Sequence, residues 1–360
     1  MHKDIIIIGG GIIGMLSARE LAAAGARVTI IDKSHWGQES SWAGGGILSP
    51  LYPWRYSGAV NRLAYWSQQT YQELSLSLHA ATGIDPQWTR SGLLVLDQEQ
   101  QSEAKTWARD YSMPAESITP AQDPRFRCQT PTPDADALWF PEIAHIRNPR
   151  LLQALHQELE ASGVDFRLHH EVTGFEQSAN RVHTALTTAG PVAGEQFLIC
   201  AGAWSGVLAQ TLRLNLAITP VKGQMLLFDA KPDTVPCMVL QQGRYLIPRQ
   251  DGKVLVGSTL EHTGFEKKTT DAARQELFDF AVSVYPALSG FPIQKHWAGL
   301  RPGIDDGVPV IDQHPDFDNV FINTGHYRNG VVLAPASSRL ICNIIMAQPP
   351  ILDPSPYKIQ

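Results

Sequence analysis

The sequence has few cysteines and no pattern that would hold a metal ion. Its 360 residues include four cysteines, none of which forms a C-x-x-C pair, and its twelve histidines show no H-E-x-x-H or similar ligand spacing. Zinc and dithiol sites depend on such close spacing. We therefore expect no bound metal and interpret the cysteines as reduced structural residues, namely Cys128, Cys200, Cys237 and Cys342.

Long hydrophobic runs and an excess of positive charge are also missing. No stretch approaches the roughly 20 uninterrupted apolar residues that a membrane-spanning helix requires, and no targeting segment is evident. The formal net charge is −6, whereas a surface that binds nucleic acid or anionic lipid needs a basic face. We therefore expect a cytoplasmic protein whose partners include neither nucleic acid nor a membrane.

The N-terminus carries a pattern typical of a dinucleotide-binding βαβ unit. The stretch DIIIIGGGIIGML joins a β-branched run, suited to a strand buried on both faces, to Gly9, Gly11 and Gly14 in the order G-x-G-x-x-G. These glycines allow a tight turn, the approach of backbone amides to a pyrophosphate, and close packing of helix on strand. A second apolar strand, 27–31, ends in Asp32, whose carboxylate can accept ribose hydroxyls. We favour a nucleotide over a simple glycine turn because all parts of the unit are present.

Residues 34–50 are rich in glycine, serine and tryptophan. A flexible surface loop has this composition, but Ser40, Ser41 and the glycine run 44–46 also offer hydroxyls and backbone amides suited to a phosphate and a planar ring. We favour the cofactor contact. The aromatic segment that follows, beginning at Tyr52, suits a lid over a pocket and ordinary surface aromatics equally well.

Periodicity along the rest of the chain predicts two folding units. Helices are expected at 15–24, 61–82, 98–111, 148–162 and 271–285, and strands at 92–96, 170–177, 182–190 and 195–200. A final strand followed by a helix is expected within 319–345. Alternating strands between 214 and 260 favour an antiparallel sheet with one face lining a site. The proline-rich segment 114–141 is expected to be an irregular connection between domains.

We therefore predict an α/β protein of about two domains. One is a Rossmann-like nucleotide-binding domain that is discontinuous in sequence, and the other is a substrate domain built on a largely antiparallel sheet. The predicted boundaries are 1–80, 145–215 and 298–345 for the first, 81–144 and 216–297 for the second, and 346–360 for a C-terminal tail.

Five blocks, in order over essentially the whole chain, carry a resemblance to a known family. They are GGGIIG at 9–14, SSWAGGGIL at 40–48, RYLIPR at 244–249, AGLRPGIDDG at 298–307 and GHYRNGVVLAP at 325–335. In them the chain resembles the FAD-dependent amine oxidases of the D-amino-acid oxidase family, and most closely its glycine oxidases of thiazole synthesis. The last block is peculiar to flavin members. Related sarcosine oxidases tether flavin through a cysteine, but 297–306 has none here, so we expect non-covalent FAD.

The resemblance implies FAD contacts at both ends of the chain. They are expected at Gly9, Gly11, Ile12, Ile13, Gly14, Asp32, Lys33, Ser40, Ser41, Gly45, Gly46, Ile47, Val172, His326, Tyr327, Arg328, Asn329, Gly330, Val331 and Val332. Residues 326–332 would form a turn and helix start at the pyrimidine edge of the flavin, where a helix N-terminus stabilises negative charge on the reduced ring. The alternative is that these glycines only shape a turn.

For the substrate, the resemblance implies three residues. Arg301 resembles a carboxylate clamp, because a guanidinium offers a planar bidentate fork. Tyr245 resembles its hydroxyl partner and Arg328 a second substrate contact. Three alternatives remain open, since interior polar groups usually have partners whatever their role. Arg301 could close a buried ion pair, Tyr245 could be a half-buried strand tyrosine, and Arg328 could only support the flavin.

The activity implied is oxidative deamination of glycine and other small amines, including sarcosine and small D-amino acids. Hydride passes to FAD, oxygen reoxidises the flavin to give hydrogen peroxide, and the products are glyoxylate or another α-keto acid and ammonia. No protein acid or base is expected to be essential, because orientation and electrostatics supply the catalysis.

Several alternatives stay open at this stage. One is a D-amino-acid dehydrogenase that passes electrons to a quinone or protein acceptor, and another is a flavin-binding module without chemistry. Thiamine biosynthesis and amino-acid catabolism are both compatible with the sequence. A homo-oligomer is expected only by analogy with the family, in which tetramers are frequent.

Overall fold

The N-terminal pattern folds as the centre of a parallel sheet. In the computed structural model, which describes residues 3–126 and 136–359, β1 (Asp4–Ile8) pairs in parallel with β2 (Arg27–Ile31) on one side and β10 (Gln196–Ile199) on the other. Its four isoleucines are at most 5% exposed, which confirms the strand predicted to be buried on both faces. The six strands follow the order β16-β17-β10-β1-β2-β6. The outer ones are β6 (Asp165–Arg167), β16 (Val310–Gln313) and β17 (Val320–Thr324).

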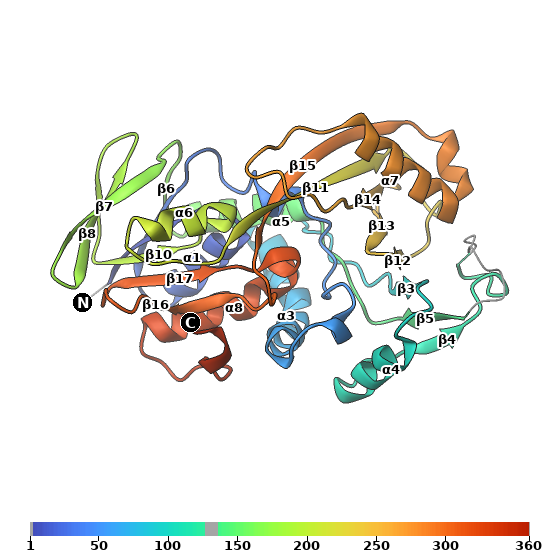
Figure 1. Cartoon of the computed structure of the whole chain (residues 1–360), viewed down its shortest axis with the longest axis horizontal. Coiled ribbons are helices and arrows are strands. Elements are labelled where there is room, and N and C mark those ends of the chain that lie inside the picture. Colours follow the sequence, from blue (N-terminus) through green and yellow to red (C-terminus); the bar gives the residue numbers. More distant parts are fainter. Residues whose placement is uncertain (1–2, 127–135, 360) are drawn as a thin grey trace.

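Different layers cover the two faces of this sheet (Figure 1). Because side chains alternate along a strand, Ile5 and Ile7 join a core with the helices, whereas Ile6 and Ile8 join the core on the opposite face. The helical layer contains α1 (Ile12–Ala23), α3 (Gly58–Thr82), α5 (Asn148–Ala161) and α8 (Gly330–Ile345). The opposite layer contains α6 (Ser205–Gln210) and the small sheet of β7 (Val172–Ser178), β8 (Arg181–Thr187) and β9 (Val192–Ala193).

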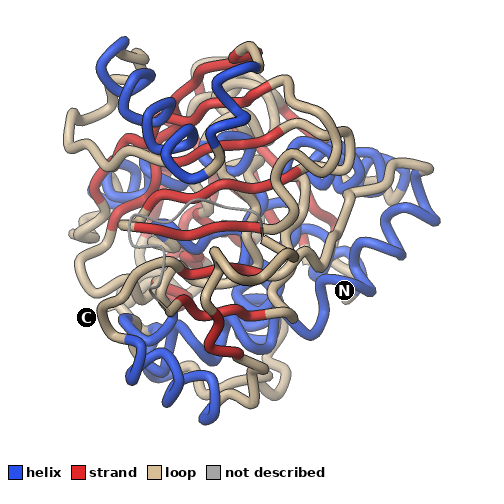
Figure 2. The backbone as a smooth tube through the Cα atoms, turned by 90° about the vertical axis from the view of Figure 1, so that its right-hand side faces the viewer, coloured by secondary structure: helices blue, strands red, loops and turns tan. Residues whose placement is uncertain are grey.

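An eight-stranded sheet organises the other half of the molecule, in the order β15-β11-β14-β13-β12-β3-β5-β4. Only the β12–β3 pair is parallel, so the predicted α/β fold with a largely antiparallel second sheet is confirmed. Figure 2 faces this half and shows its strands crossing the view one below another. The strands are β3 (Leu93–Val95), β4 (Glu116–Ile118), β5 (Ala137–Phe140), β11 (Thr219–Phe228), β12 (Met238–Gln241), β13 (Arg244–Pro248), β14 (Val254–Gly257) and β15 (Ile293–Gly303).

The two faces of the larger sheet also differ. Leu226 and Val256 share a core with Leu277 of α7 (Asp271–Val284). Met225 and Tyr245 point to the other face, where they share a core with α4 (Gln101–Asp110). The expectation of one packed face and one face that lines a site therefore agrees with the alternation along β11.

The expectation of an irregular connection over 114–141 is wrong. This segment supplies β4 and β5, and β5 lies inside the eight-stranded sheet between β3 and β4. Ala137, Leu138 and Phe140 are buried there. The strand was hidden because it is only four residues long, follows a proline-rich stretch and pairs with a partner more than forty residues away. Cys128 lies outside the described residues, whereas Cys200, Cys237 and Cys342 are buried.

The predicted domain boundary at residue 298 lies too early, because the chain returns to the parallel sheet only after β15. β15 stays paired with β11 from Ile293 to Gly303, so residues 298–303 belong to the eight-stranded sheet. Pro302 made a strand end plausible, but β15 is an edge strand, where proline is tolerated. The C-terminal segment packs on the molecule, since the buried Tyr357 hydroxyl donates to the carbonyl of Ala59 at 2.9 Å. Within residues 3–126 and 136–359 no helix has the length and hydrophobicity to cross a bilayer.

Candidate cofactor and substrate site

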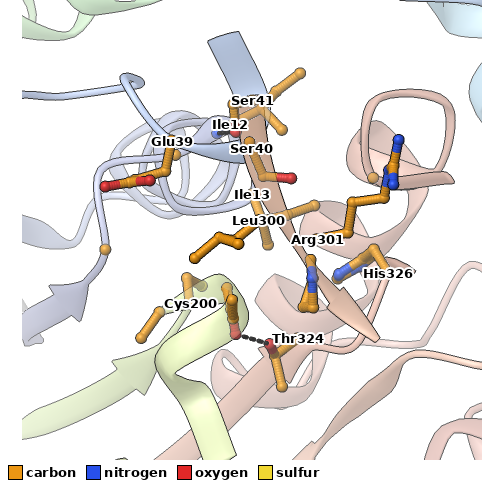
Figure 3. Close-up of a pocket in the computed structure, with 18 of the residues that line it drawn as sticks. Ile12, Ile13, Glu39, Ser40, Ser41, Cys200, Leu300, Arg301, Thr324 and His326 are labelled. Carbon is orange, nitrogen blue, oxygen red and sulfur yellow. Dashed lines mark hydrogen bonds between the residues drawn. The ribbon is translucent and has the colours of Figure 1, made fainter. Parts of the chain in front are cut away.

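A cavity of about 480 Å³ lies between the two large sheets. Figure 3 shows Ser40 and Ser41 above it and Thr324 and His326 below it. The predicted cofactor residues that line this cavity are Gly9, Gly11, Ile12, Ile13, Asp32, Lys33, Ser40, Ser41, Gly45, Gly46, Ile47, Val172, His326, Tyr327, Arg328, Gly330, Val331 and Val332. All three predicted substrate residues line it as well. Residues from both ends of the chain thus meet in one site.

The turn between β1 and α1 suits a pyrophosphate. α1 begins at Ile12, directly after Gly11 and three residues before the expected start at Met15. The helix has no acidic residue in its first turn and no side-chain cap. The amides of Gly11 and Ile13 have no hydrogen-bond partner in the part of the chain that the structure describes. Unpaired amides at the positive end of a helix dipole bind phosphate oxygens.

Two predicted cofactor residues do not line the cavity. A Cβ atom at Gly14 would lie 1.9 Å from the carbonyl oxygen of Gly9, so this glycine lets α1 approach β1, as its place in the fingerprint implies. Asn329 is buried, and neither its side-chain oxygen nor its nitrogen has a hydrogen-bond partner among the described residues. Such an unpaired buried amide is costly and points to a polar group that the protein alone does not supply.

Asp32 and Lys33 follow β2 and line the cavity beside the β1–α1 turn, the part of the cavity called the nucleotide end below. The Asp32 carboxylate accepts the amides of Gly10 at 2.8 Å and Ser34 at 2.9 Å, so it also ties together the two loops that form this end. The Lys33 ammonium lies 3.2 Å from the centre of the Trp204 ring, a cation–π contact. Burial lowers the pKa of Lys33, against an opposing effect of Glu39.

The turn after β17 brings a second helix N-terminus to the cavity. The short helix η4 (Tyr327–Asn329) leads directly into α8, which begins at Gly330. The buried His326 places Nε2 3.0 Å from the hydroxyl of Ser337, and burial lowers the pKa of His326 to about 3, so its ring is neutral at pH 7. Negative charge at this end of the cavity would therefore be stabilised by the start of α8 and not by a histidine cation.

Arg301 reaches the cavity from β15. Its Nη2 donates to the hydroxyl of Ser258 at 2.7 Å, and its Nη1 donates to the carbonyl of Thr259 at 3.3 Å. No carboxylate within the described ranges pairs with it, so the alternative of a buried ion pair is not what the structure shows. Burial lowers the pKa of the Arg301 guanidinium. Arg301 is half-buried, and a cation that lines a cavity without an anionic partner is a site for an anionic ligand.

Tyr245 and Arg328 line the same end of the cavity as Arg301, called the substrate end below. The Tyr245 side chain is buried, and its hydroxyl lies 3.5 Å from the sulfur of Met225. The Arg328 guanidinium donates to the carbonyl of Gly243, in the turn between β12 and β13, at 3.0 Å. One nitrogen of the Arg328 guanidinium is thus bonded to the protein.

Several residues that line the cavity escaped the sequence analysis. A Cβ atom at Gly223 would lie 2.1 Å from Nη2 of Arg301, and one at Gly299 would lie 2.5 Å from Cβ of Ala43. Glycine inside a strand often marks a close approach, so these two carried a usable signal. Ser258 and Trp204 carried none, because their role depends on neighbours that are distant in sequence.

Comparison with known proteins gives consistent matches over the whole chain. The family model described as DAO, FAD dependent oxidoreductase, matches residues 4–344. A glycine oxidase from Pseudomonas aeruginosa is 45% identical and covers 99% of this chain and 98% of its own. A bifunctional protein ThiO/ThiG from Nostoc sp. is 32% identical, with 97% of this chain and 53% of that longer protein covered.

The fold matches a solved relative equally well. The crystal structure of glycine oxidase from Geobacillus kaustophilus superposes with a TM-score of 0.93 at 26% identity, covering 100% of this chain and 99% of the other. The family expected from the five sequence blocks, and FAD as its cofactor, are confirmed by these matches. The unpaired amides of the β1–α1 turn and the start of α8 are compatible with that cofactor.

Proposed function

Because the chain belongs to the FAD-dependent oxidoreductase (DAO) family, we propose that it is a glycine oxidase that also accepts sarcosine and small D-amino acids. The observation that carries the proposal is the guanidinium of Arg301, which lines the cavity half-buried and has no carboxylate partner among the described residues. An amino-acid carboxylate supplies the missing charge and fits the planar fork of the guanidinium. The high identity to proteins named glycine oxidase supports the choice of substrate.

The residues at this end of the cavity would orient the substrate. Arg301 would hold the carboxylate, the Tyr245 hydroxyl would donate to it, and the backbone carbonyl of Arg328 would accept from the amine. The β1–α1 turn and the start of α8 would hold FAD, whose redox chemistry would be acceptance of a hydride from the α-carbon and reoxidation by oxygen. The protein would contribute fixed geometry and the positive N-terminus of α8, which favours negative charge nearby.

Among the described residues, no carboxylate lies at the substrate end of the cavity to act as a general acid or base. The carboxylates that line the described cavity are Asp32, Glu39 and Glu171, and none of them comes from the eight-stranded sheet. His326 is neutral and bonded to Ser337. Substrate would therefore react with its amine already neutral, and the imine product would be hydrolysed to glyoxylate and ammonia.

One assay of the FAD-loaded protein tests the proposal. Glycine, sarcosine and D-alanine are supplied in air and hydrogen peroxide is measured, and flavin bleaching by glycine is followed without oxygen. Peroxide formed from glycine would support the oxidase. Turnover only with an artificial acceptor would indicate a dehydrogenase, and a flavin that glycine does not bleach would indicate a binding module. Release of the yellow chromophore by acid would support non-covalent FAD.

The proposal extends to the cellular setting. We place the protein in the cytoplasm. We also place it in thiazole synthesis for thiamine, and the similarity to a protein named ThiO/ThiG supports this pathway. A homo-oligomer, with a tetramer as the form suggested by family analogy, is tested by light scattering. A thiO-type deletion strain that regains thiamine-independent growth with this chain would support the pathway.

A further inference from the structure

The loop that contains Gly44, Gly45 and Gly46 is held from outside the cavity at three consecutive carbonyls. Nδ2 of Asn148 donates to the Gly44 carbonyl at 3.0 Å, and the amide of Ile146 donates to the Gly46 carbonyl at 2.8 Å. Between them, the Gly45 carbonyl accepts a 2.7 Å hydrogen bond from Nη2 of Arg249. Each carbonyl of the loop is thus tied to a different residue outside the loop.

These ties determine where the amides point. In a planar trans peptide the carbonyl and the next amide N–H point in opposite directions. With the three carbonyls held outward, the amides of Gly45, Gly46 and Ile47 point the other way, and all three residues line the cavity. None of these amides has a hydrogen-bond partner in the described ranges. The loop therefore presents a row of free donors toward the cavity.

The row lies beside the substrate residues. A Cβ atom at Gly45 would come within 2.9 Å of the Tyr245 ring, so this loop meets the substrate end of the cavity. Gly46 has φ +82°, and a Cβ atom there would lie 2.1 Å from the Ile146 carbonyl oxygen. Glycine is thus required for the loop to adopt this path.

Arg249 is an unusual residue for a purely structural tie. It follows β13 and is 7% exposed, and its Nη1 lies 3.1 Å from the Ile146 carbonyl and 3.2 Å from Nδ1 of His145. Burial lowers the pKa of Arg249 to about 10, and burial together with Arg249 lowers that of His145 far enough to keep its ring neutral. Asp251, two residues along, pairs instead with Arg147 at 2.9 Å.

A buried cation with only neutral acceptors costs free energy that a neutral donor would avoid. A full positive charge is useful where it acts on negative charge that appears during function. The guanidinium lies one peptide group away from the free amide of Gly46, so its charge also polarises that peptide and strengthens the donor. A lysine could not span the carbonyls of Gly45 and Ile146 with one fork.

We propose that Arg249 is a positioning residue for the flavin: it fixes the Gly45–Gly46 peptide so that three amides donate to the ring, and its charge favours the reduced cofactor. The inference rests on the proposed placement of FAD in this cavity. It assigns a role to the last residue of the block RYLIPR, which the substrate contacts do not use.

Two variants separate position from charge. Arg249→Lys keeps the charge and loses the fork, and we expect about tenfold weaker FAD binding and a shifted visible flavin spectrum. Arg249→Met loses both the charge and the fork. We expect it also to change the equilibrium constant between oxidised and two-electron-reduced flavin about tenfold in favour of the oxidised form, which lowers the midpoint potential by about 30 mV. Arg147→Met is the matched control, because it removes a neighbouring arginine from its ion pair with Asp251. It should match wild type in each of the measurements described next.

The readouts are the FAD dissociation constant, the visible spectrum, the midpoint potential, and hydrogen exchange of a peptide covering residues 44–48. FAD should protect this peptide in wild type, and the protection should be smaller in both Arg249 variants. A folded Arg249→Lys protein with wild-type FAD affinity and spectrum would overturn the inference. So would wild-type protein whose 44–48 peptide is not protected by FAD, a test that needs no variant. If wild type oxidises glycine in either case, the proposed function stands and only this inference fails.

Discussion

Nη2 of Arg301 donates a 2.7 Å hydrogen bond to the hydroxyl of Ser258. This bond fixes one edge of a guanidinium whose other hydrogen bonds within the described residues go to two backbone carbonyls, those of Thr259 and Lys222. Ser258 therefore sets the angle at which the fork of Arg301 meets a carboxylate. A hydrogen bond to a charged group contributes about 1.5–3 kcal/mol when its partner stays buried.

Ser258→Ala should weaken substrate binding without loss of cofactor. We expect the KM for glycine to rise about tenfold, the change that about 1.4 kcal/mol produces, while kcat changes little and the FAD content is unchanged. Steady-state peroxide assays at saturating oxygen measure both constants. Ser283→Ala, on an exposed turn of α7, is the control. An unchanged KM in Ser258→Ala would remove Ser258 from the site.

Gly223→Ala tests the same guanidinium from the other side. The new methyl group would lie 2.1 Å from Nη2 of Arg301, so the guanidinium must move. We expect a KM for glycine raised by about a hundredfold, as for a misplaced binding group, with FAD still bound. Gly290→Ala is a matched control because a Cβ atom there meets no atom within 4 Å. Equal kinetics for the two variants would contradict the position of Arg301.

How much of this could be predicted from sequence depends on how local each signal is. The turn after β1 was predicted because its glycines, the strand before them and the helix after them are contiguous in sequence. The atoms that Gly9 and Gly11 approach, the carbonyl of Cys200 and the hydroxyl of Ser41, are distant in sequence and could not be predicted. The resemblance led to Arg301 and Tyr245 because they sit in recognisable blocks. Ser258 was missed because its only distinguishing feature is a bond to a residue 43 positions away. β5 was missed because a four-residue strand gains its stability from partners and not from its own pattern.

The neutral state of His326 should appear in the pH dependence of stability. Burial lowers the pKa of His326 to about 3, whereas an unfolded histidine titrates near 6.5. The unfolded chain therefore binds the proton first, and the contribution of His326 to the free energy of unfolding is complete above about pH 6.5 and is lost as the pH falls toward 3. Between pH 7 and 5.5 the loss amounts to about 1 kcal/mol.

Urea unfolding of the apoprotein at these two pH values measures this loss. In His326→Gln the drop in unfolding free energy should be smaller than in wild type by about 1 kcal/mol. His79→Gln, on the exposed face of α3, should keep the wild-type drop. The same drop in all three proteins would mean that His326 is protonated in the folded state.

The segment between β14 and α7 contacts the nucleotide end of the cavity in two ways. Phe265 stacks on Trp204 with ring centres 5.4 Å apart, and Lys267 lies 2.9 Å from the carboxylate of Glu39. Trp204 and Glu39 both line the cavity. An aromatic pair contributes about 0.5–1.5 kcal/mol, whereas an exposed ion pair contributes about 0–1 kcal/mol and is screened by salt.

The stack should therefore retain FAD more effectively than the ion pair. In Phe265→Ala we expect FAD to dissociate about fivefold faster, as an aromatic contact of this strength implies. In Lys267→Ala the rate should stay within about twofold of wild type at physiological salt. Recovery of free-flavin fluorescence after large dilution of each FAD-loaded protein measures both rates. A faster loss of FAD from Lys267→Ala than from Phe265→Ala would show that charge, and not the ring contact, holds this segment over the cofactor.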